Sequence, residues 1–180
     1  MSSRILILGS NSFSGSHFVT HCLSEGFEVI GISRSDEISP VYLPYTWKSF
    51  SKFNFFSFDL NLHLKGIMQV INDFQPEYII NFAAQSMVGE SWNHPEDWFI
   101  TNTVSMINFH NKLRHCSFIK KYVHISTPEV YGNCTGLVKE NTNYNPSTPY
   151  AVSRAAADMS LMSFFKAYNC PVIFTRAANV

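Results

Sequence analysis

A short stretch rich in glycine and serine, Gly9-Ser10-Asn11-Ser12-Phe13-Ser14-Gly15, follows an apolar run and precedes a segment of helical period. The first amides of a helix have no intrahelical acceptor and lie at the positive end of the helix dipole, so such a corner can bind a pyrophosphate. Gly9 would permit the tight turn, and Gly15 the close approach of helix and strand. We therefore predict a dinucleotide-binding turn made by Gly9, Asn11, Ser12, Phe13, Ser14 and Gly15. The alternative is an ordinary strand-to-helix corner, which also favours small residues.

The second apolar run is followed by Ser33 and Arg34, and these two residues bear on which dinucleotide would bind. NAD-preferring sites usually have an acidic residue at this point, against the ribose hydroxyls of the adenosine. A small hydroxyl and a guanidinium would instead bind a 2′-phosphate through charge-assisted hydrogen bonds. NADP is therefore the predicted cofactor, and NAD is the alternative because Asp36 and Glu37 lie close by in the sequence.

Apolar runs of strand length alternate with longer segments of helical period along the chain. This alternation predicts an α/β fold: one Rossmann-type, doubly wound parallel sheet with helices on both faces, forming a single domain over residues 1–180. The expected strands are Arg4–Leu8, Glu28–Ile32, Asn54–Phe58, Tyr78–Phe82, Lys121–Ser126 and Val172–Arg176. The expected helices are Phe13–Glu25, Leu62–Phe74, Pro95–His115 and Thr148–Tyr168. Ser35–Lys52 lacks a clear period and is expected to be a packed excursion between the second and third strands.

The bulk composition argues against several other classes of protein. Thirteen basic and thirteen acidic side chains give a formal net charge of zero, so no general field attracts nucleic acid or an anionic membrane surface. The four cysteines include no CxxC pair and the histidines show no complete ligand spacing, so no metal site is predicted. The first apolar stretch is too short for a signal peptide or a membrane span, and a cytoplasmic protein is expected.

The glycine-rich turn is the first of five motifs in a recurring order. The others are Asn81–Ser86, Thr101-Asn102, Ser126–Gly132 and Pro149–Arg154. Together they resemble the nucleotide-sugar 4,6-dehydratases, of both the dTDP-glucose and the GDP-mannose types, within the extended short-chain dehydrogenase/reductases. The resemblance extends over nearly the whole chain. It implies a nucleotide-diphosphate sugar as substrate and a cofactor that takes hydride from sugar C4, returns it to C6 after water is lost across C5 and C6, and is regenerated in each turnover. A nucleotide-sugar epimerase or reductase and a non-catalytic dinucleotide-binding module are the alternatives.

The resemblance also implies roles for individual residues. Tyr150 matches the active-site tyrosine, and Arg154 stands in place of the lysine whose charge lets a phenol of ordinary pKa about 10 act as a base. Arginine keeps that charge but cannot give up its proton. Thr127 matches the residue that hydrogen-bonds the C4 oxygen, and Glu129 matches the base for the C5 proton. Pro128 stands where the dTDP-glucose type has an acid.

Further positions match cofactor and substrate contacts of the family. Implied cofactor contacts are Ser33, Arg34, Asp59, Leu60, Phe82, Ala83, Ala84, Asn102, Tyr150 and Arg154. Implied substrate contacts are Gln85, Ser86, Thr127 and Asn179. The family's remaining sugar-binding part would follow Val180, so we expect the chain to be a truncated, cofactor-binding part without the C-terminal substrate domain. Dimeric relatives associate through two helices, and a homodimer through the helices near 95–115 and 148–168 is therefore expected.

Overall fold

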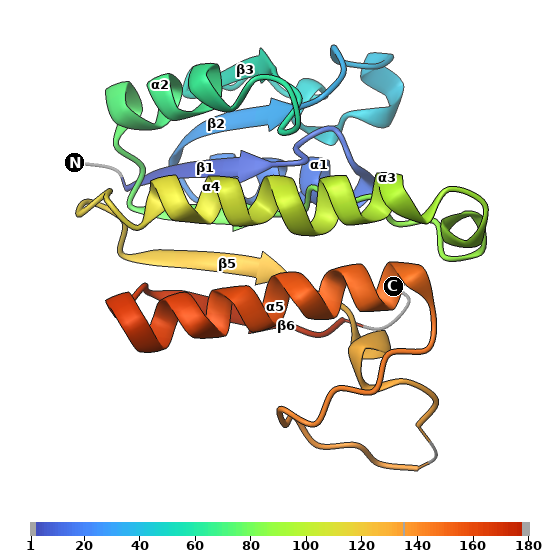
Figure 1. Cartoon of the computed structure of the whole chain (residues 1–180). Coiled ribbons are helices and arrows are strands. Elements are labelled where there is room, and N and C mark those ends of the chain that lie inside the picture. The colour runs from blue at the N-terminus through green and yellow to red at the C-terminus, as the bar shows by residue number, and fades with distance from the viewer. Residues whose placement is uncertain (1–2, 135, 178–180) are drawn as a thin grey trace. The chain divides into compact units, whose positions relative to one another are not determined.

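Long apolar runs form the centre of a six-stranded sheet, whose order is β3-β2-β1-β4-β5-β6. A computed structural model describes residues 3–134 and 136–177 (Figure 1). The strands are β1 (Arg4–Leu8), β2 (Glu28–Ser33), β3 (Phe53–Ser57), β4 (Tyr78–Asn81), β5 (Lys121–Ile125) and β6 (Val172–Thr175). Four of the five residues of β1 are buried, as expected for a strand with neighbours on both sides.

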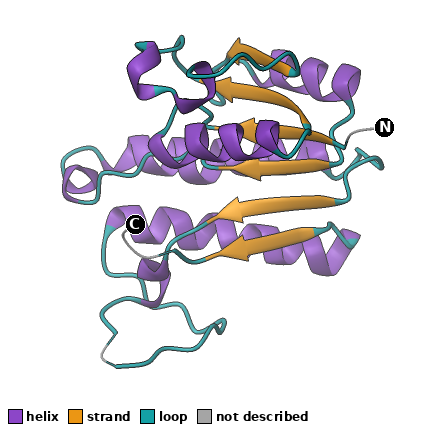
Figure 2. Cartoon of the chain, turned by 180° about the vertical axis from the view of Figure 1, so that it is seen from behind, coloured by secondary structure: helices purple, strands orange, loops and turns teal. Residues whose placement is uncertain are grey.

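The strand order identifies the fold class. Neighbouring strands from β1 to β5 pair in parallel, and Figure 2 shows their arrows pointing the same way. The chain moves outward from β1 to β2 and β3, then returns to place β4 on the other side of β1. Such a reversal defines a doubly wound sheet and creates a switch point between β1 and β4. The predicted Rossmann-type α/β fold is confirmed.

The predicted helix boundaries agree with the structure to within two residues. The helices are α1 (Phe13–Ser24), α2 (Leu64–Phe74), α3 (Pro95–Phe99), α4 (Met106–Leu113) and α5 (Pro149–Tyr168). Short 3-10 turns are η1 (Pro40–Tyr42), η2 (Pro44–Thr46), η3 (Gly89–Trp92) and η5 (Pro128–Tyr131). The helix expected near 95–115 differs in one respect, because the π-helical turn η4 (Ile100–Ser105) separates α3 from α4. The apolar period continues through this turn, so periodicity alone did not reveal it.

Local sequence explains where the two site-bearing helices begin. The Ser12 hydroxyl caps α1 by accepting the Gly15 amide at 3.0 Å. The Thr148 hydroxyl caps α5 by accepting the Ala151 amide at 3.1 Å, and Pro149 follows as the first helical residue. Both are standard helix starts, since a hydroxyl satisfies an orphan amide and proline has no amide to satisfy.

Contacts divide the chain into two compact units. Unit 1 comprises Met1–Ala83, His115–His124 and Pro171–Ile173, and unit 2 comprises Ala84–Arg114, Ile125–Cys170 and Phe174–Val180. The glycine-rich turn belongs to unit 1, whereas Thr127, Glu129 and Tyr150 belong to unit 2. Across the residues described above, no helix has the length and apolar character needed to cross a membrane.

Acidification is expected to destabilise unit 2 through His110 of α4. This side chain is 3% exposed, and burial lowers its pKa from 6.5 to about 3. A folded-state pKa below the unfolded value means that the stabilisation is complete above pH 6.5 and is lost as the pH falls towards 3. We expect His110→Leu to remove about 2 kcal/mol of the loss of unfolding free energy between pH 7.5 and pH 5, measured by urea denaturation. The exposed His115→Gln serves as the control, and an unchanged pH dependence in His110→Leu would contradict the assignment.

Candidate functional site

The turn after β1 has no room for side chains at its two glycines. Gly9 has a φ of +77°, and a Cβ there would lie 2.8 Å from the Ala83 amide nitrogen. A Cβ on Gly15 would overlap the Gly9 carbonyl oxygen and lie 2.8 Å from the Ser12 hydroxyl oxygen. The Gly9 amide also donates to the Ile32 carbonyl at 2.7 Å, which joins the turn to the end of β2. Both glycines are therefore required by steric contact.

Ser12 closes this turn with its hydroxyl. It donates to the Gly9 carbonyl at 2.7 Å and accepts the Gly15 amide at 3.0 Å. The amides of Phe13 and Ser14, the first two helical residues, have no acceptor within the helix. Phe13 and Ser14 are both exposed residues at this corner. The turn therefore fits a pyrophosphate, although one amide of the helix start is already satisfied by Ser12.

The end of β2 is held to the turn by side-chain hydrogen bonds. Ser33 is 9% exposed, and its hydroxyl accepts the Asn11 amide at 2.9 Å and lies 3.3 Å from the Ser10 hydroxyl. Arg34, the next residue, is exposed. The side chain of Asn11 bonds to the main chain of Ser35 and Asp36. The Ser33 hydroxyl predicted to meet a 2′-phosphate is therefore already engaged within the protein.

Polar side chains also shape the turns after β3 and β4. The Asp59 carboxylate accepts the Asn61 amide at 2.6 Å, and the Asp59 amide donates to His63 Nδ1 at 2.9 Å, with Leu60 in the same turn. Asn81 is 1% exposed; its Oδ1 accepts the Ala83 amide at 2.9 Å and its Nδ2 donates to the Tyr122 hydroxyl at 2.9 Å. Asn81 therefore orders the Phe82-Ala83 segment. The sequence analysis missed this role, for which the only signal was a polar residue ending a buried strand.

In unit 2, Asn102 of the π-helical turn orders the segment that begins with Ala84. Asn102 is fully buried, accepts the Gln85 amide at 2.8 Å, and donates to the Gln85 carbonyl at 2.9 Å and the Ser153 hydroxyl at 3.0 Å. All of these are bonds within the protein, so the structure places Asn102 as a support for Gln85. Ser86, which follows, is exposed.

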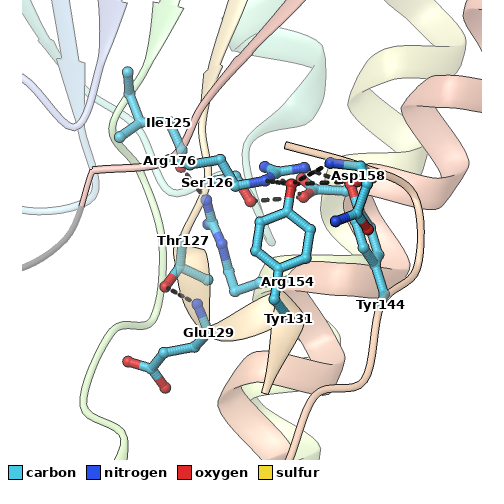
Figure 3. Close-up of polar contacts among 10 residues, drawn as sticks. Ile125, Ser126, Thr127, Glu129, Tyr131, Tyr144, Arg154, Asp158 and Arg176 are labelled. Carbon is cyan, nitrogen blue, oxygen red and sulfur yellow. Dashed lines mark hydrogen bonds and ion pairs between the residues drawn. The ribbon is translucent and has the colours of Figure 1, made fainter. Parts of the chain in front are cut away.

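Thr127 and Glu129 lie together on the turn that follows β5. Thr127 is 5% exposed and accepts the Glu129 amide at 3.2 Å, which caps η5, and Pro128 occupies the first position of that turn (Figure 3). Glu129 is half-buried. The turn η5 packs against α5, whose second residue is Tyr150. The three side chains expected to act on a sugar are thus carried by two adjoining elements of unit 2.

Arg154 is directed into the interior of unit 2. It is 2% exposed, and its guanidinium donates to the main-chain carbonyl of Ile125 at the end of β5 (Figure 3). Asp158, one helical turn further along α5, is fully buried and stabilises the charge of Arg154. The family's lysine is expected to reach the cofactor, whereas this arginine joins α5 to β5.

A second arginine, Arg176, whose side chain is 11% exposed, completes the charge cluster around Asp158. Arg176 pairs with the Asp158 carboxylate at 2.9 Å, and Ser126 donates to the same carboxylate at 2.7 Å. Arg176 also donates to the hydroxyls of Tyr131 and Tyr144 (Figure 3). Burial raises the pKa of Asp158, while Ser126 and Arg176 oppose that rise. The sequence analysis did not identify this cluster, because its members come from four separate segments.

A pocket of about 450 Å³ lies beside η5 in unit 2. Its lining includes Glu129, Tyr131, Cys134, Glu140 and Arg176. Within the described ranges, no three histidine, cysteine or acidic side chains gather as metal ligands would. Asn179, predicted to contact the substrate, lies outside the described residues.

Gly15→Ala is expected to destabilise the protein by at least about 2 kcal/mol, because the added methyl overlaps the Gly9 carbonyl and the turn must open. Gly89→Ala is the matched control, since a Cβ there meets nothing within 4 Å. Urea denaturation of both variants gives the comparison. Equal stabilities would mean that the turn is not closed as described.

Asp158→Asn is expected to cost about 3 kcal/mol of unfolding free energy, because it leaves the buried guanidinium of Arg154 and the partly buried one of Arg176 without their counter-charge. Asp97→Asn on the exposed surface of α3 is the control, with an expected change below about 0.5 kcal/mol. Thermal or urea denaturation measures both. A cost for Asp158→Asn as small as that of the control would show that the cluster contributes no net stability.

Comparison with known proteins identifies the family to which this chain is similar. A sequence model described as GDP-mannose 4,6 dehydratase matches residues 6–180. A probable dTDP-glucose 4,6-dehydratase of Sinorhizobium fredii is 28% identical over 98% of this chain and 53% of its own length. A dTDP-glucose 4,6-dehydratase of Xanthomonas campestris is 27% identical over 97% of this chain and 52% of its own length. The chain thus spans about half the length of the curated relatives it matches.

Solved structures give the same result for the fold. The dTDP-glucose 4,6-dehydratase of Bacillus anthracis in complex with NAD superposes with a TM-score of 0.84 at 28% identity, over 99% of this chain and 55% of the other. The UDP-glucose 4-epimerase of Thermus thermophilus in complex with NAD gives 0.82 at 28% identity, over 96% and 54%. The match over residues 6–180, together with the doubly wound sheet, shows that this chain belongs to the GDP-mannose 4,6-dehydratase family.

Proposed function

We propose that this chain is the cofactor-binding part of a nicotinamide-dinucleotide-dependent nucleotide-sugar 4,6-dehydratase. The observation that carries the proposal is the pairing of Thr127 and Glu129 on η5, packed against the helix that presents Tyr150. Because the chain spans about half of its relatives, the activity is proposed for the protein at the length of those relatives.

In this proposal the dinucleotide supplies the hydride acceptor for sugar C4 and the hydride donor for C6. The chain's own residues handle the protons: Tyr150 takes the proton of the C4 hydroxyl, and Glu129 takes the C5 proton while Thr127 binds the C4 oxygen. Glu129 is half-buried beside a pocket, so it is accessible to a ligand and still partly shielded from water. Pro128 cannot donate a proton to the leaving C6 hydroxyl, so Glu129 or a water must supply it.

The carboxylate of Glu129 is what separates this proposal from an epimerase. Simple C4 epimerisation moves a hydride away from C4 and back, and it needs no base for the C5 proton. UDP-glucose 4-epimerases share the fold, so the fold alone does not discriminate. A carboxylate two residues after Thr127, on the turn that Thr127 caps, favours elimination of water.

A second candidate, a non-catalytic dinucleotide-binding module, is favoured by Arg154. A tyrosine acts as a base only with positive charge nearby. The Arg154 guanidinium is buried and donates to Ile125, so its charge lies within unit 2 beside Asp158. In this candidate the turn after β1 still binds the dinucleotide, but Tyr150 does not turn over a sugar.

NADP as the particular dinucleotide is proposed on Arg34 alone. The Ser33 hydroxyl is engaged by Asn11, and Asp36 and Glu37 are exposed carboxylates that would repel a 2′-phosphate. NAD is therefore a stronger alternative to NADP than the sequence alone indicated. The dehydratase and epimerase structures of similar fold are complexes with NAD, which supports a nicotinamide dinucleotide as the cofactor.

A homodimer through α3–α4 and α5 is also proposed. These helices pack together in unit 2 and leave large apolar side chains exposed. They are Ile100, Val104, Val152, Met159 and Phe165, with exposed fractions from 37% to 58%. A second copy would remove this apolar surface from water.

The test uses a protein extended to the length of its relatives. It is incubated with dTDP-glucose and with GDP-mannose, and products are analysed by NMR. We expect a 4-keto-6-deoxy sugar, and we expect Glu129→Gln to lower its rate of formation by at least about 100-fold with unchanged dinucleotide affinity. Glu96→Gln on the exposed surface of α3 is the control.

Three results would go against the proposal in different ways. An epimerised sugar that keeps its C6 hydroxyl would identify an epimerase. Bound dinucleotide with no product from either sugar would favour the non-catalytic module. A folded protein that retains neither NADH nor NADPH would reject the whole assignment.

A further inference from the structure

The connection between β2 and β3 returns to the turn after β1 in unit 1. Within this connection Leu43 is 1% exposed and Tyr45 is 4% exposed, although both lie in a segment without regular period. The turn η2, which carries Tyr45, packs on α1. The Tyr45 ring lies 4.7 Å from that of Phe53 at the start of β3. The expected packed excursion is thus fixed against the same helix that opens at the phosphate-binding turn.

Asn11 joins this connection to the turn through both ends of its side-chain amide and through its main-chain amide. Its Nδ2 donates to the carbonyls of Ser35 at 3.2 Å and Asp36 at 3.1 Å, and its Oδ1 accepts the Tyr45 hydroxyl at 3.1 Å. Its main-chain amide donates to the Ser33 hydroxyl at 2.9 Å. A side-chain amide has two donor hydrogens and one acceptor oxygen, so no donor of Asn11 is left for a ligand.

The Tyr45 hydroxyl stays protonated, so it keeps the hydrogen that it donates. Its hydroxyl has a second acceptor close by in the Glu37 carboxylate, and burial together with that carboxylate raises the pKa of the phenol. The phenol therefore stays protonated throughout the neutral range. The phenol thus keeps the hydrogen that it donates to Asn11 at the pH at which dinucleotide binding would be measured.

We propose that Asn11 and Tyr45 are positioning residues for dinucleotide binding. The inference rests on the proposed dinucleotide site. Asn11, predicted from the sequence to contact the cofactor, would instead act on it indirectly, by ordering the turn. The Asn11–Tyr45 bond fixes the turn two residues before the Phe13 amide, so that the amides which open α1 are already ordered before the ligand arrives. A binding loop ordered in advance loses less conformational entropy on binding, which raises affinity without a new contact.

The test measures NADH and NADPH binding to the 180-residue chain by fluorescence titration at 10 °C. The variants are Tyr45→Phe, Asn11→Ala and the double variant. Tyr42→Phe is the matched control, because Tyr42 is 68% exposed in the neighbouring turn η1. We expect Tyr45→Phe to weaken binding of the preferred dinucleotide by about 3- to 10-fold, the range that loss of one hydrogen bond produces. Tyr42→Phe should leave the dissociation constant unchanged.

The double variant distinguishes a coupled pair from two independent residues. If the two residues act through their mutual bond, the double variant binds the dinucleotide no more weakly than Asn11→Ala does. If its loss of affinity equals the product of the two single losses, the inference is overturned. A lowered melting temperature with an unchanged dissociation constant of Tyr45→Phe would also overturn it, since the bond would then be merely structural. If the wild-type chain binds neither dinucleotide, the proposed function fails and the inference fails with it, whereas wild-type binding that Tyr45→Phe does not alter rejects the inference alone.

Discussion

The structure depends on a steric constraint at the corner between β1 and α1. Gly9 lies against the Phe82-Ala83 backbone and Gly15 lies against Gly9, so the helix can begin this close to the strand only where both side chains are absent. Through the bond from Gly9 to Ile32, the same corner is tied to the end of β2. The start of α1 and the segments that follow β1, β2 and β4 meet at this one close approach, at the switch point of the sheet.

Within each of the two units, polar side chains order the loops through hydrogen bonds inside the protein. Ser12 satisfies the turn from within, and Asn11 fastens it to the next connection. Asn81 and Asn102 do the same for the segments after β4, each through bonds to the main chain. A buried polar group is retained only if it is hydrogen-bonded, and each of these amides meets that condition by fixing a loop of the site.

Unit 2 contains a buried charge cluster that is stable only if its charges are compensated. One buried carboxylate, Asp158, compensates two arginines, and the second of them orients the tyrosines at 131 and 144. Such a cluster is costly to desolvate and is stable only when complete. Arg154 adds a planar donor to this cluster, and its positive charge is compensated within unit 2 by Asp158.

The sequence by itself determined the sheet, the order of its elements and the glycine-rich turn. Apolar period and helix caps such as Thr148 are local signals, and they located every strand and the outer ends of the helical segments to within two residues, but not the π-helical turn within residues 95–113. Only the tertiary structure decided what the polar residues do. Asn11, Ser33 and Arg154 were read from the sequence as ligand contacts, but each has neighbours from distant segments that use its hydrogen-bonding groups. Hydrogen bonding depends on atoms brought together by folding, and no local pattern in the chain records those distances.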